Sequence, residues 1–129
     1  MTEPKLRKVY DRTKLEELTQ LFDLGIVLVT PAVMALLDER QQSEFLARHW
    51  RGNFGKHGNF WDIVQTLTDD ELQHGAMETG EDGRLNTIAI RTEGDVHNIV
   101  LSVYEHQEQT FWILTHIGQY TTLLLPSEY

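Results

Sequence analysis

The last third of the chain constrains the fold most, because apolar and polar residues alternate there with a period of two between short connectors. Alternation of this kind predicts strands that bury one face. After the segment Glu81-Asp82-Gly83 we expect four strands, over Leu85–Arg91, Asn98–Tyr104, Thr110–Thr115 and Tyr120–Leu125. Connectors of only a few residues join antiparallel neighbours, so these strands predict a meander rather than parallel crossovers.

Helical signals dominate the middle of the chain. Thr30 caps free amides and Pro31 fits the first helical position, so a helix is expected to begin there and to end near Arg40. Ser43 is the expected N-cap of a second helix over Glu44–Trp50, which the glycines that follow bring to an end. A glycine-rich loop comes next.

Further segments complete the expected fold. We expect a strand over Phe22–Val29, a helix over Phe60–Leu67, and a helix over Asp69–His74 that begins after Thr68 and closes on Gly75. Residues 1–20 are expected to form an N-terminal arm with a short helix capped by Thr13, and residues 21–129 a single domain. The expected fold class is α+β, a mainly antiparallel sheet of about five strands with helices packed on one face.

Composition excludes several kinds of chemistry. The chain has 129 residues, enough to bury a core, and no cysteine, which excludes disulfides, thiolate metal sites and a cysteine nucleophile. Its N-terminus is charged and lacks the apolar centre of a signal peptide, and its apolar runs are too short to cross a bilayer. We therefore expect a cytoplasmic protein.

The net charge of −9 is unevenly distributed. Residues 1–56 hold nine Lys and Arg against eight Asp and Glu, whereas residues 57–129 hold two against twelve. The second half therefore lacks the cations that phosphate contacts require, and binding of free nucleic acid is not expected. Its acids form either an ordinary solvated surface or an acidic surface that meets a basic partner or imitates a nucleic-acid backbone. The candidate acidic residues are Glu78, Glu81, Asp82, Glu93, Asp95, Glu105 and Glu108.

A basic and aromatic cluster in LARHWRGNFG, residues 46–55, is the candidate binding site. Arginine with tryptophan is a favoured combination at protein interfaces, and the same mixture can stack on and neutralise nucleotides. The alternative for the aromatic residues is that they close the core over the sheet. His49 is either a partly buried helix-end imidazole or a general base or ligand contact beside its arginines. The candidate binding residues are Arg48, His49, Trp50, Arg51, Phe54, Lys56 and Trp61.

No catalytic constellation stands out in the sequence. The six histidines lack the H-x-x-x-H spacing that places two imidazoles on one helical face. The serines lie outside any G-x-S-x-G elbow, and no phosphate-binding or dinucleotide motif is present. We therefore expect no catalytic residue, no metal and no cofactor.

Several of these motifs together resemble a group of small bacterial and plasmid-borne proteins, described as plasmid-related proteins or as type I restriction endonuclease subunit M. The resemblance covers residues 22–129 and rests on Thr30-Pro31, on residues 46–55, on Asp69-Asp70-Glu71-Leu72 with Gly75, and on the terminal TTLLLPSEY. The turn after Trp112-Ile113 departs from the pattern of that group. The resemblance implies a mobile-element setting and a compact α+β domain. It implies no methyltransferase, since 129 residues cannot hold that catalytic domain.

Three functional hypotheses follow. The first is a small non-enzymatic protein that binds a protein partner and modulates a host nuclease or restriction system through its acidic surface. The second is a small enzyme or nucleotide binder that uses Arg48, His49 and Arg51 near the glycine loop. The third is a structural accessory subunit, including a homodimer formed through an open sheet edge.

Overall fold

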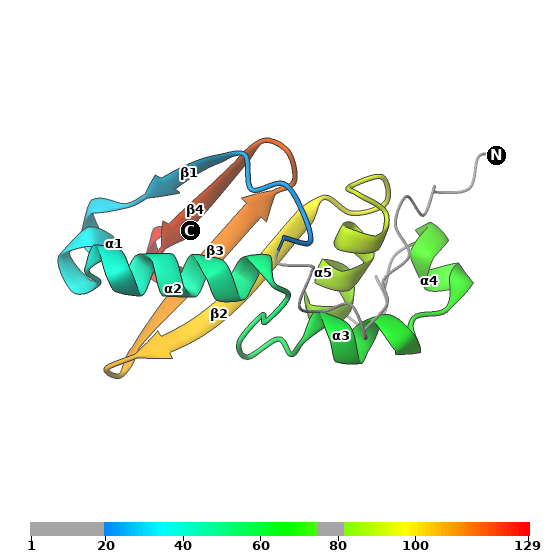
Figure 1. Cartoon of the computed structure of the whole chain (residues 1–129), viewed down its shortest axis with the longest axis horizontal. Helices are drawn as coiled ribbons and strands as arrows, with labels where there is room; N and C mark the ends of the chain where they lie inside the picture. The colour runs from blue at the N-terminus through cyan, green and yellow to red at the C-terminus, as the bar shows by residue number, and fades with distance from the viewer. Residues whose placement is uncertain (1–19, 75–81) are drawn as a thin grey trace.

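The computed structural model describes residues 20–74 and 82–129, which form a mixed four-stranded sheet and several helices (Figure 1). The predicted arm over residues 1–20, apart from Gln20, lies outside the described residues, as does Gly75. None of the described helices has the length and apolar character that a membrane-spanning helix needs. The elements in chain order are β1 (Ile26–Val29), α1 (Pro31–Leu36), α2 (Glu39–Trp50), α3 (Phe60–Ile63), the 3-10 turn η2 (Val64–Thr66), α4 (Asp69–His74), α5 (Asp82–Arg91), β2 (Ile99–His106), β3 (Gln109–His116), β4 (Tyr120–Leu124) and the 3-10 turn η3 (Pro126–Glu128).

The sheet has the order β1-β4-β3-β2, with β1 parallel to β4 and the other neighbours antiparallel. The α+β class and the antiparallel meander of the last three strands are therefore confirmed. The expected count of about five strands is wrong, because the described chain contributes four. Strand β1 can lie parallel to β4 because the chain between them is long and passes through the helices, and a parallel pair needs such a long connection.

The segment predicted as a strand over Leu85–Arg91 is a helix, and this removes the fifth strand. The β-branched Thr87, Ile88 and Ile90 suggested a strand. In the fold, residues 86–90 are all buried. The change between a buried and an exposed face, which identifies a surface helix in a sequence, is therefore missing from this run. Tertiary packing therefore overrides local propensity in α5.

Several helix boundaries also differ from those expected. Thr30 caps α1 as predicted, but α1 ends at Leu36, before Arg40. The cap of α2 is Asp38 rather than Ser43, because Asp38 and Gln41 form a reciprocal capping box. The helix over residues 60–67 divides into α3 and η2. The helix Asp69–His74 has the expected bounds, whereas only Ile26–Val29 of the predicted Phe22–Val29 strand is extended into the sheet.

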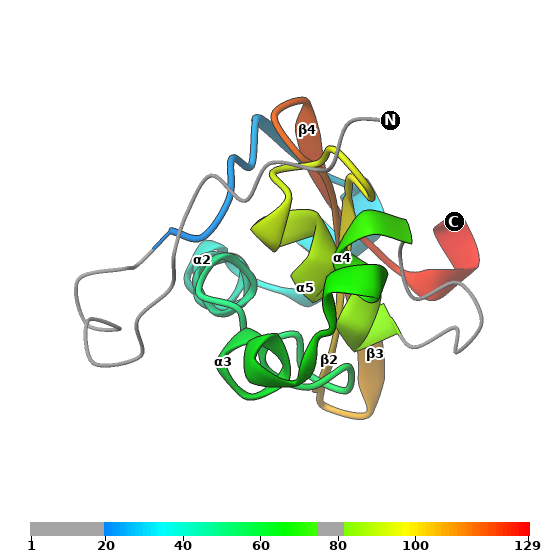
Figure 2. The same cartoon turned by 90° about the vertical axis from the view of Figure 1, so that its right-hand side faces the viewer.

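Two of the helices cover one face of the sheet, as the view along it shows (Figure 2). Helix α2 packs Phe45 against Tyr104, Phe111, Ile113 and Leu123. Helix α5 contributes Ala89 and Ile90 to a second cluster beside β2. The 3-10 turn η3 leads instead to the opposite face, where Tyr129 lies 5.6 Å from the Trp112 ring. The expectation that helices pack on one face therefore holds for α2 and α5 and fails for η3.

Candidate functional site

His49, the centre of the predicted binding cluster, is fully buried between α2 and the sheet. Its Nδ1 lies 2.6 Å from Ser102 Oγ and its Nε2 lies 2.8 Å from Thr115 Oγ1. Thr115 Oγ1 in turn lies 2.7 Å from Thr121 Oγ1, which donates to the Leu24 carbonyl. One polar chain therefore connects α2 with β2, β3 and β4 and ends beside β1.

The last hydrogen bond of this polar chain, from Thr121 to the Leu24 carbonyl, fixes which groups donate in the bonds before it. The only O–H of Thr121 is given to Leu24, so Thr115 must donate to Thr121. Thr115 must then accept from His49 Nε2–H, so in a neutral imidazole Nδ1 accepts from Ser102. A neutral imidazole therefore has a single tautomer here, in which both nitrogens are satisfied.

Burial supports the same protonation state. Desolvation lowers the pKa of His49 from 6.5 to about 3, because a charged imidazole has no water around it here. A general base must reach a substrate proton, and a ligand contact must reach a ligand. An enclosed imidazole with both nitrogens engaged does neither, so the geometry gives His49 a positioning role for α2.

The neighbours of His49 on α2 diverge from one another. The Arg48 guanidinium lies 4.4 Å from the centre of the Tyr104 ring, a cation–π contact that packs it beside the sheet. Trp50 donates from Nε1 to the Phe22 carbonyl at 2.6 Å. Arg51 is exposed at the C-cap of α2. The structure therefore does not assemble these side chains into one pocket.

The remaining members of the predicted cluster also separate. Phe54 and Trp61 are buried in the core beside α5, as the alternative interpretation of the aromatic residues expected. Lys56 is exposed, and its Nζ lies 2.6 Å from Glu105 Oε1. Its backbone N–H donates to the Val103 carbonyl. The segment after α2 therefore lies along β2 as part of the fold.

The candidate acidic residues fall into separate groups. Glu78 and Glu81 lie outside the described residues, and Asp82 lies 3.4 Å from His57 at the start of α5. Glu93 and Asp95 precede β2, whereas Glu105 and Glu108 lie at its far end. A strand of this length spans about 23 Å at the usual rise per residue. The described acids therefore do not form one continuous surface.

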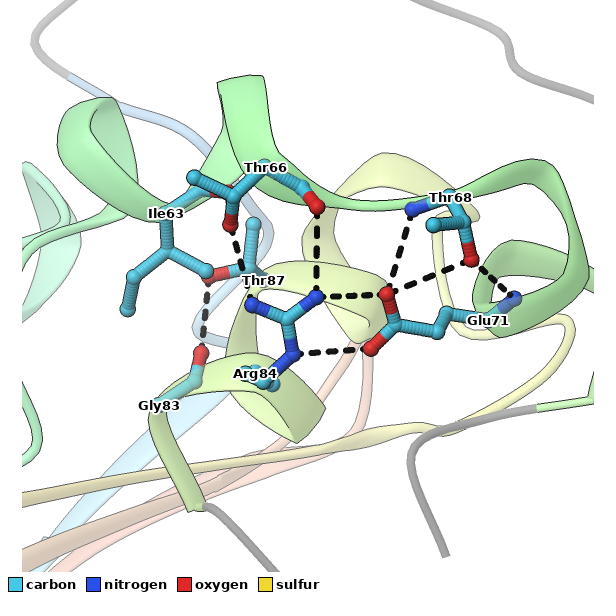
Figure 3. Close-up of polar contacts among 7 residues, drawn as sticks. All are labelled: Ile63, Thr66, Thr68, Glu71, Gly83, Arg84 and Thr87. Atoms are coloured by element: carbon cyan, nitrogen blue, oxygen red, sulfur yellow. Dashed lines mark hydrogen bonds and ion pairs between the residues drawn. The ribbon is translucent and has the colours of Figure 1, made fainter. Parts of the chain in front are cut away.

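Arg84 forms a polar clamp that the sequence did not reveal (Figure 3). Its Nε and one terminal nitrogen donate to the two carboxylate oxygens of Glu71, at 2.7 and 2.5 Å. The other terminal nitrogen donates to Thr66 Oγ1 at 2.9 Å. The bond from Arg84 is the main reason that the pKa of Glu71 falls from 4.5 to about 2. The clamp ties α4 and η2 to α5, and its acceptors and donors are occupied by one another.

No three His, Asp or Glu side chains within residues 20–74 and 82–129 lie close enough together to hold a metal ion. The remaining candidate is a backbone surface, and it appears when the two edges of the sheet are compared. On the β2 edge, the Asn86 side chain donates to the Leu101 carbonyl at 2.7 Å and accepts from the Leu101 N–H at 2.8 Å. Val103 N–H donates to the Phe54 carbonyl, and the Val103 carbonyl accepts from Lys56. The centre of the β2 edge, at Leu101 and Val103, is therefore closed by its own chain.

The β1 edge lacks such a cover among the described residues. Ile26 N–H donates to Gln119 and Thr30 N–H donates to Leu123, so these alternate residues face β4. Val27 and Val29 consequently direct their N–H and C=O groups away from the sheet, and none of the described residues bonds to them. Figure 1 shows β1 at the margin of the sheet, with no helix beyond it.

Exposed apolar side chains accompany the open edge. Ile26 is 69% exposed, Leu28 is 50% exposed, and Met34 on the following helix is 61% exposed. A groove of about 550 Å³ lies between β1 and α2, lined by Val27, Leu46 and Trp50 among others. Residues 24–37 contain no charged side chain, although charged residues make up 24% of the chain. Exposed apolar side chains gathered at one edge of a sheet are typical of an interaction site.

Comparison of the chain with protein-family models, with curated protein sequences and with solved structures yields no match. The resemblance to plasmid-related proteins therefore stays a prediction.

Proposed function

We propose that this chain is a non-enzymatic protein-binding domain and that its partner adds a strand to the open β1 edge. The observation that carries the proposal is the contrast in backbone hydrogen bonding: Leu101 and Val103 on one edge are satisfied, whereas Val27 and Val29 on the other have no partner among residues 20–74 and 82–129. An extended segment that pairs with such an edge gains backbone hydrogen bonds, while neighbouring apolar positions select its side chains. Natural proteins usually protect an edge of this kind with charges, proline or a covering element.

The β1 edge lies apart from the residues that the sequence favoured as a binding surface. The acidic residues contribute electrostatic steering toward a basic partner at most, because the described ones are divided between the start of α5 and the two ends of β2. A role in modulating a host nuclease or restriction system rests on the resemblance alone. The enzyme alternative has weaker support, since His49 is enclosed and Arg48 and Arg51 diverge from it.

Capture by the immobilised full chain, from a bacterial lysate that also contains the same chain in soluble form, tests the proposal. Two variants separate the surfaces: Val27→Pro removes an outward N–H of β1, and joint reversal of Glu93, Asp95, Glu105 and Glu108 to lysine removes the acids. We expect Val27→Pro to lose the captured protein and the charge-reversed variant to retain it. Capture that survives Val27→Pro and disappears on charge reversal would assign binding to the acidic surface instead.

A further inference from the structure

We infer that the strand added to the β1 edge is β1 of a second copy of this chain, which makes the protein a two-fold symmetric dimer with one continuous sheet. This inference rests on the proposed function, because it names the partner of the same edge. Three properties of β1 support a copy of itself as the occupant: the geometry of its free backbone groups, its lack of charge, and the area it offers.

The free backbone groups of β1 are self-complementary. In an antiparallel pair the residues that exchange both backbone bonds are those whose N–H and C=O face the partner strand. If Leu28 of one copy lies opposite Leu28 of the other, Val27 of each lies opposite Val29 of the other. This register uses the outward N–H and C=O of all four valines and leaves none over. A two-fold axis through Leu28 therefore satisfies the edge completely.

Charge favours the same occupant. Each copy carries a net charge of −9, so two copies repel unless they meet where charges are few. Residues 24–37 form such a place, with fourteen consecutive residues that carry no charge. Asp23 lines the groove beside this stretch, but one of its carboxylate oxygens already accepts from the Gly25 N–H, so a basic partner peptide would find little charge to pair with. An apolar, uncharged strand with the same pattern is supplied by β1 itself.

The two faces of the paired strands also match. Val27 and Val29 lie on the face covered by α2, since their partners on β4 are the buried Thr121 and Leu123. Val29 of the second copy would lie opposite Val27, at the mouth of the groove between β1 and α2. Ile26 and Leu28 occupy the other face, where the two Leu28 side chains would meet at the axis.

The area predicts a weak dimer. Complete burial of the exposed parts of Ile26, Val27, Leu28, Met34 and Leu36 removes on the order of 500 Å² per copy, against about 800 Å² for a standard interface. We therefore expect a dimer weaker than one with an interface of standard size. Such a dimer is populated at high concentration and dissociates on dilution.

Sedimentation of the full chain over a range of concentrations tests the dimer, and single cysteines test its register. Val27→Pro removes an outward donor without touching the bonds to β4, and it should raise the dissociation constant at least about tenfold. Leu28→Lys places two like charges opposite each other at the axis and should have the same effect. Asn98→Lys adds the same charge at an exposed position beside β2 and should change nothing. Circular dichroism checks that each variant is folded.

The chain has no cysteine, so an introduced cysteine is a clean reporter. In the proposed register the two Leu28 Cα atoms lie about 4.5 Å apart, within disulfide range. Leu28→Cys should therefore form a disulfide dimer rapidly under mild oxidation. In Val27→Cys the two introduced cysteines lie diagonally across the strand pair, on the order of 8 Å apart, so they should cross-link at least tenfold more slowly. Tyr129→Cys, at a residue 78% exposed, measures random collision.

A chain that stays monomeric at all concentrations, with Leu28→Cys no faster than Tyr129→Cys, would overturn the inference. A dimer that persists in both Val27→Pro and Leu28→Lys would overturn it as well, because the interface would lie elsewhere.

The proposed function has outcomes of its own, which do not depend on the dimer. If the chain is monomeric but Val27→Pro abolishes capture from lysate, the edge binds another protein; if Val27→Pro changes neither association nor capture, the edge binds nothing.

Discussion

The two edges of the sheet are built in opposite ways. At the β2 edge, the outward N–H and C=O groups of Leu101 and Val103 are bonded by Asn86 and by the segment after α2. At the β1 edge, the outward groups of Val27 and Val29 meet none of the described residues. Since a sheet edge is a template for another strand, the comparison shows where the fold prevents association and where it leaves association open.

Closing the β2 edge demands side chains of special kinds. An asparagine on α5 presents an amide that imitates a peptide group, and Gly55 approaches so closely that a Cβ would lie 1.9 Å from the Val103 carbonyl oxygen. The backbone of Gly55 also has φ +65°, which other residues rarely adopt. The side chains of β1 are isoleucine, valine and leucine, which cannot hydrogen-bond to backbone groups. The strand therefore has no side chain of its own that could cover the edge.

Proline substitutions at the two edges should differ most. Val103→Pro deletes the bond to Phe54 and should lower the free energy of unfolding by about 4 kcal/mol. Val27→Pro deletes an N–H to which no residue of the described chain bonds, and it should cost less than about 1 kcal/mol. Urea denaturation at low protein concentration measures both. Equal losses would mean that the β1 edge is also paired within the chain.

Loss of the asparagine amide should open the closed edge. Asn86→Ala leaves the N–H and C=O of Leu101 without their partners, and we expect a loss of about 2 kcal/mol in the free energy of unfolding. Asn98→Ala, an exposed asparagine near the same strand, is the matched control and should be neutral. Denaturation together with light scattering checks this prediction. Stability unchanged by Asn86→Ala would mean that water replaces the amide.

The polar chain through His49 should make stability depend on pH. Between pH 6.5 and about 3 the unfolded imidazole binds a proton that the folded one does not, so stability is greatest above pH 6.5 and falls as the pH falls. The slope attributable to His49 should approach about 1.4 kcal/mol per pH unit below pH 6.

The measurement is urea denaturation at pH 7, 6 and 5, with His49→Gln as control. Glutamine does not titrate, so the variant should lack this slope while it retains the contribution of His97, whose pKa burial also lowers. The comparison does not go below pH 5 because the pKa of Glu71, lowered to about 2 by its bond to Arg84, adds a loss of the same sign in stronger acid. Identical slopes in the two proteins would show that water reaches His49.

The turn between β2 and β3 should give the smallest effect. Gln107 and Glu108 form its two central residues with φ of +50° and +64°, a geometry that asparagine and glycine adopt more readily. The double change Gln107→Asn with Glu108→Gly should raise the free energy of unfolding by about 1 kcal/mol. Thermal melting measures it. An unchanged melting temperature would indicate that two effects cancel: the strain energy that the turn loses, and the conformational entropy that the unfolded chain gains from the added glycine.

Local signals in the sequence predicted the elements whose causes are local. Thr30-Pro31 predicted α1, and Thr68 with Glu71 marked the start of α4, because a cap and its helix are neighbours in the chain. The strand predicted over residues 85–91 was wrong because α5 is buried on all sides, and that burial comes from segments distant in sequence.

The candidate site needed long-range information. The partners of His49 are 53 and 66 residues away, so its place in a polar chain could not be read from LARHWRGNFG. The charge-free run over residues 24–37 is visible in the sequence, but its meaning depends on the strand order, which leaves β1 at an edge. Likewise Arg84 meets Glu71 only because α5 folds back against α4.

Amide hydrogen exchange at two protein concentrations tests the contrast between the edges most directly. At low concentration the amides of Val27 and Val29 should exchange far faster than those of Leu101 and Val103, and at high concentration only the two β1 amides should slow down. Amides of Val27 and Val29 that are as protected as those of Leu101 and Val103 in dilute solution would contradict the account, because the β1 edge would then be closed within a single chain.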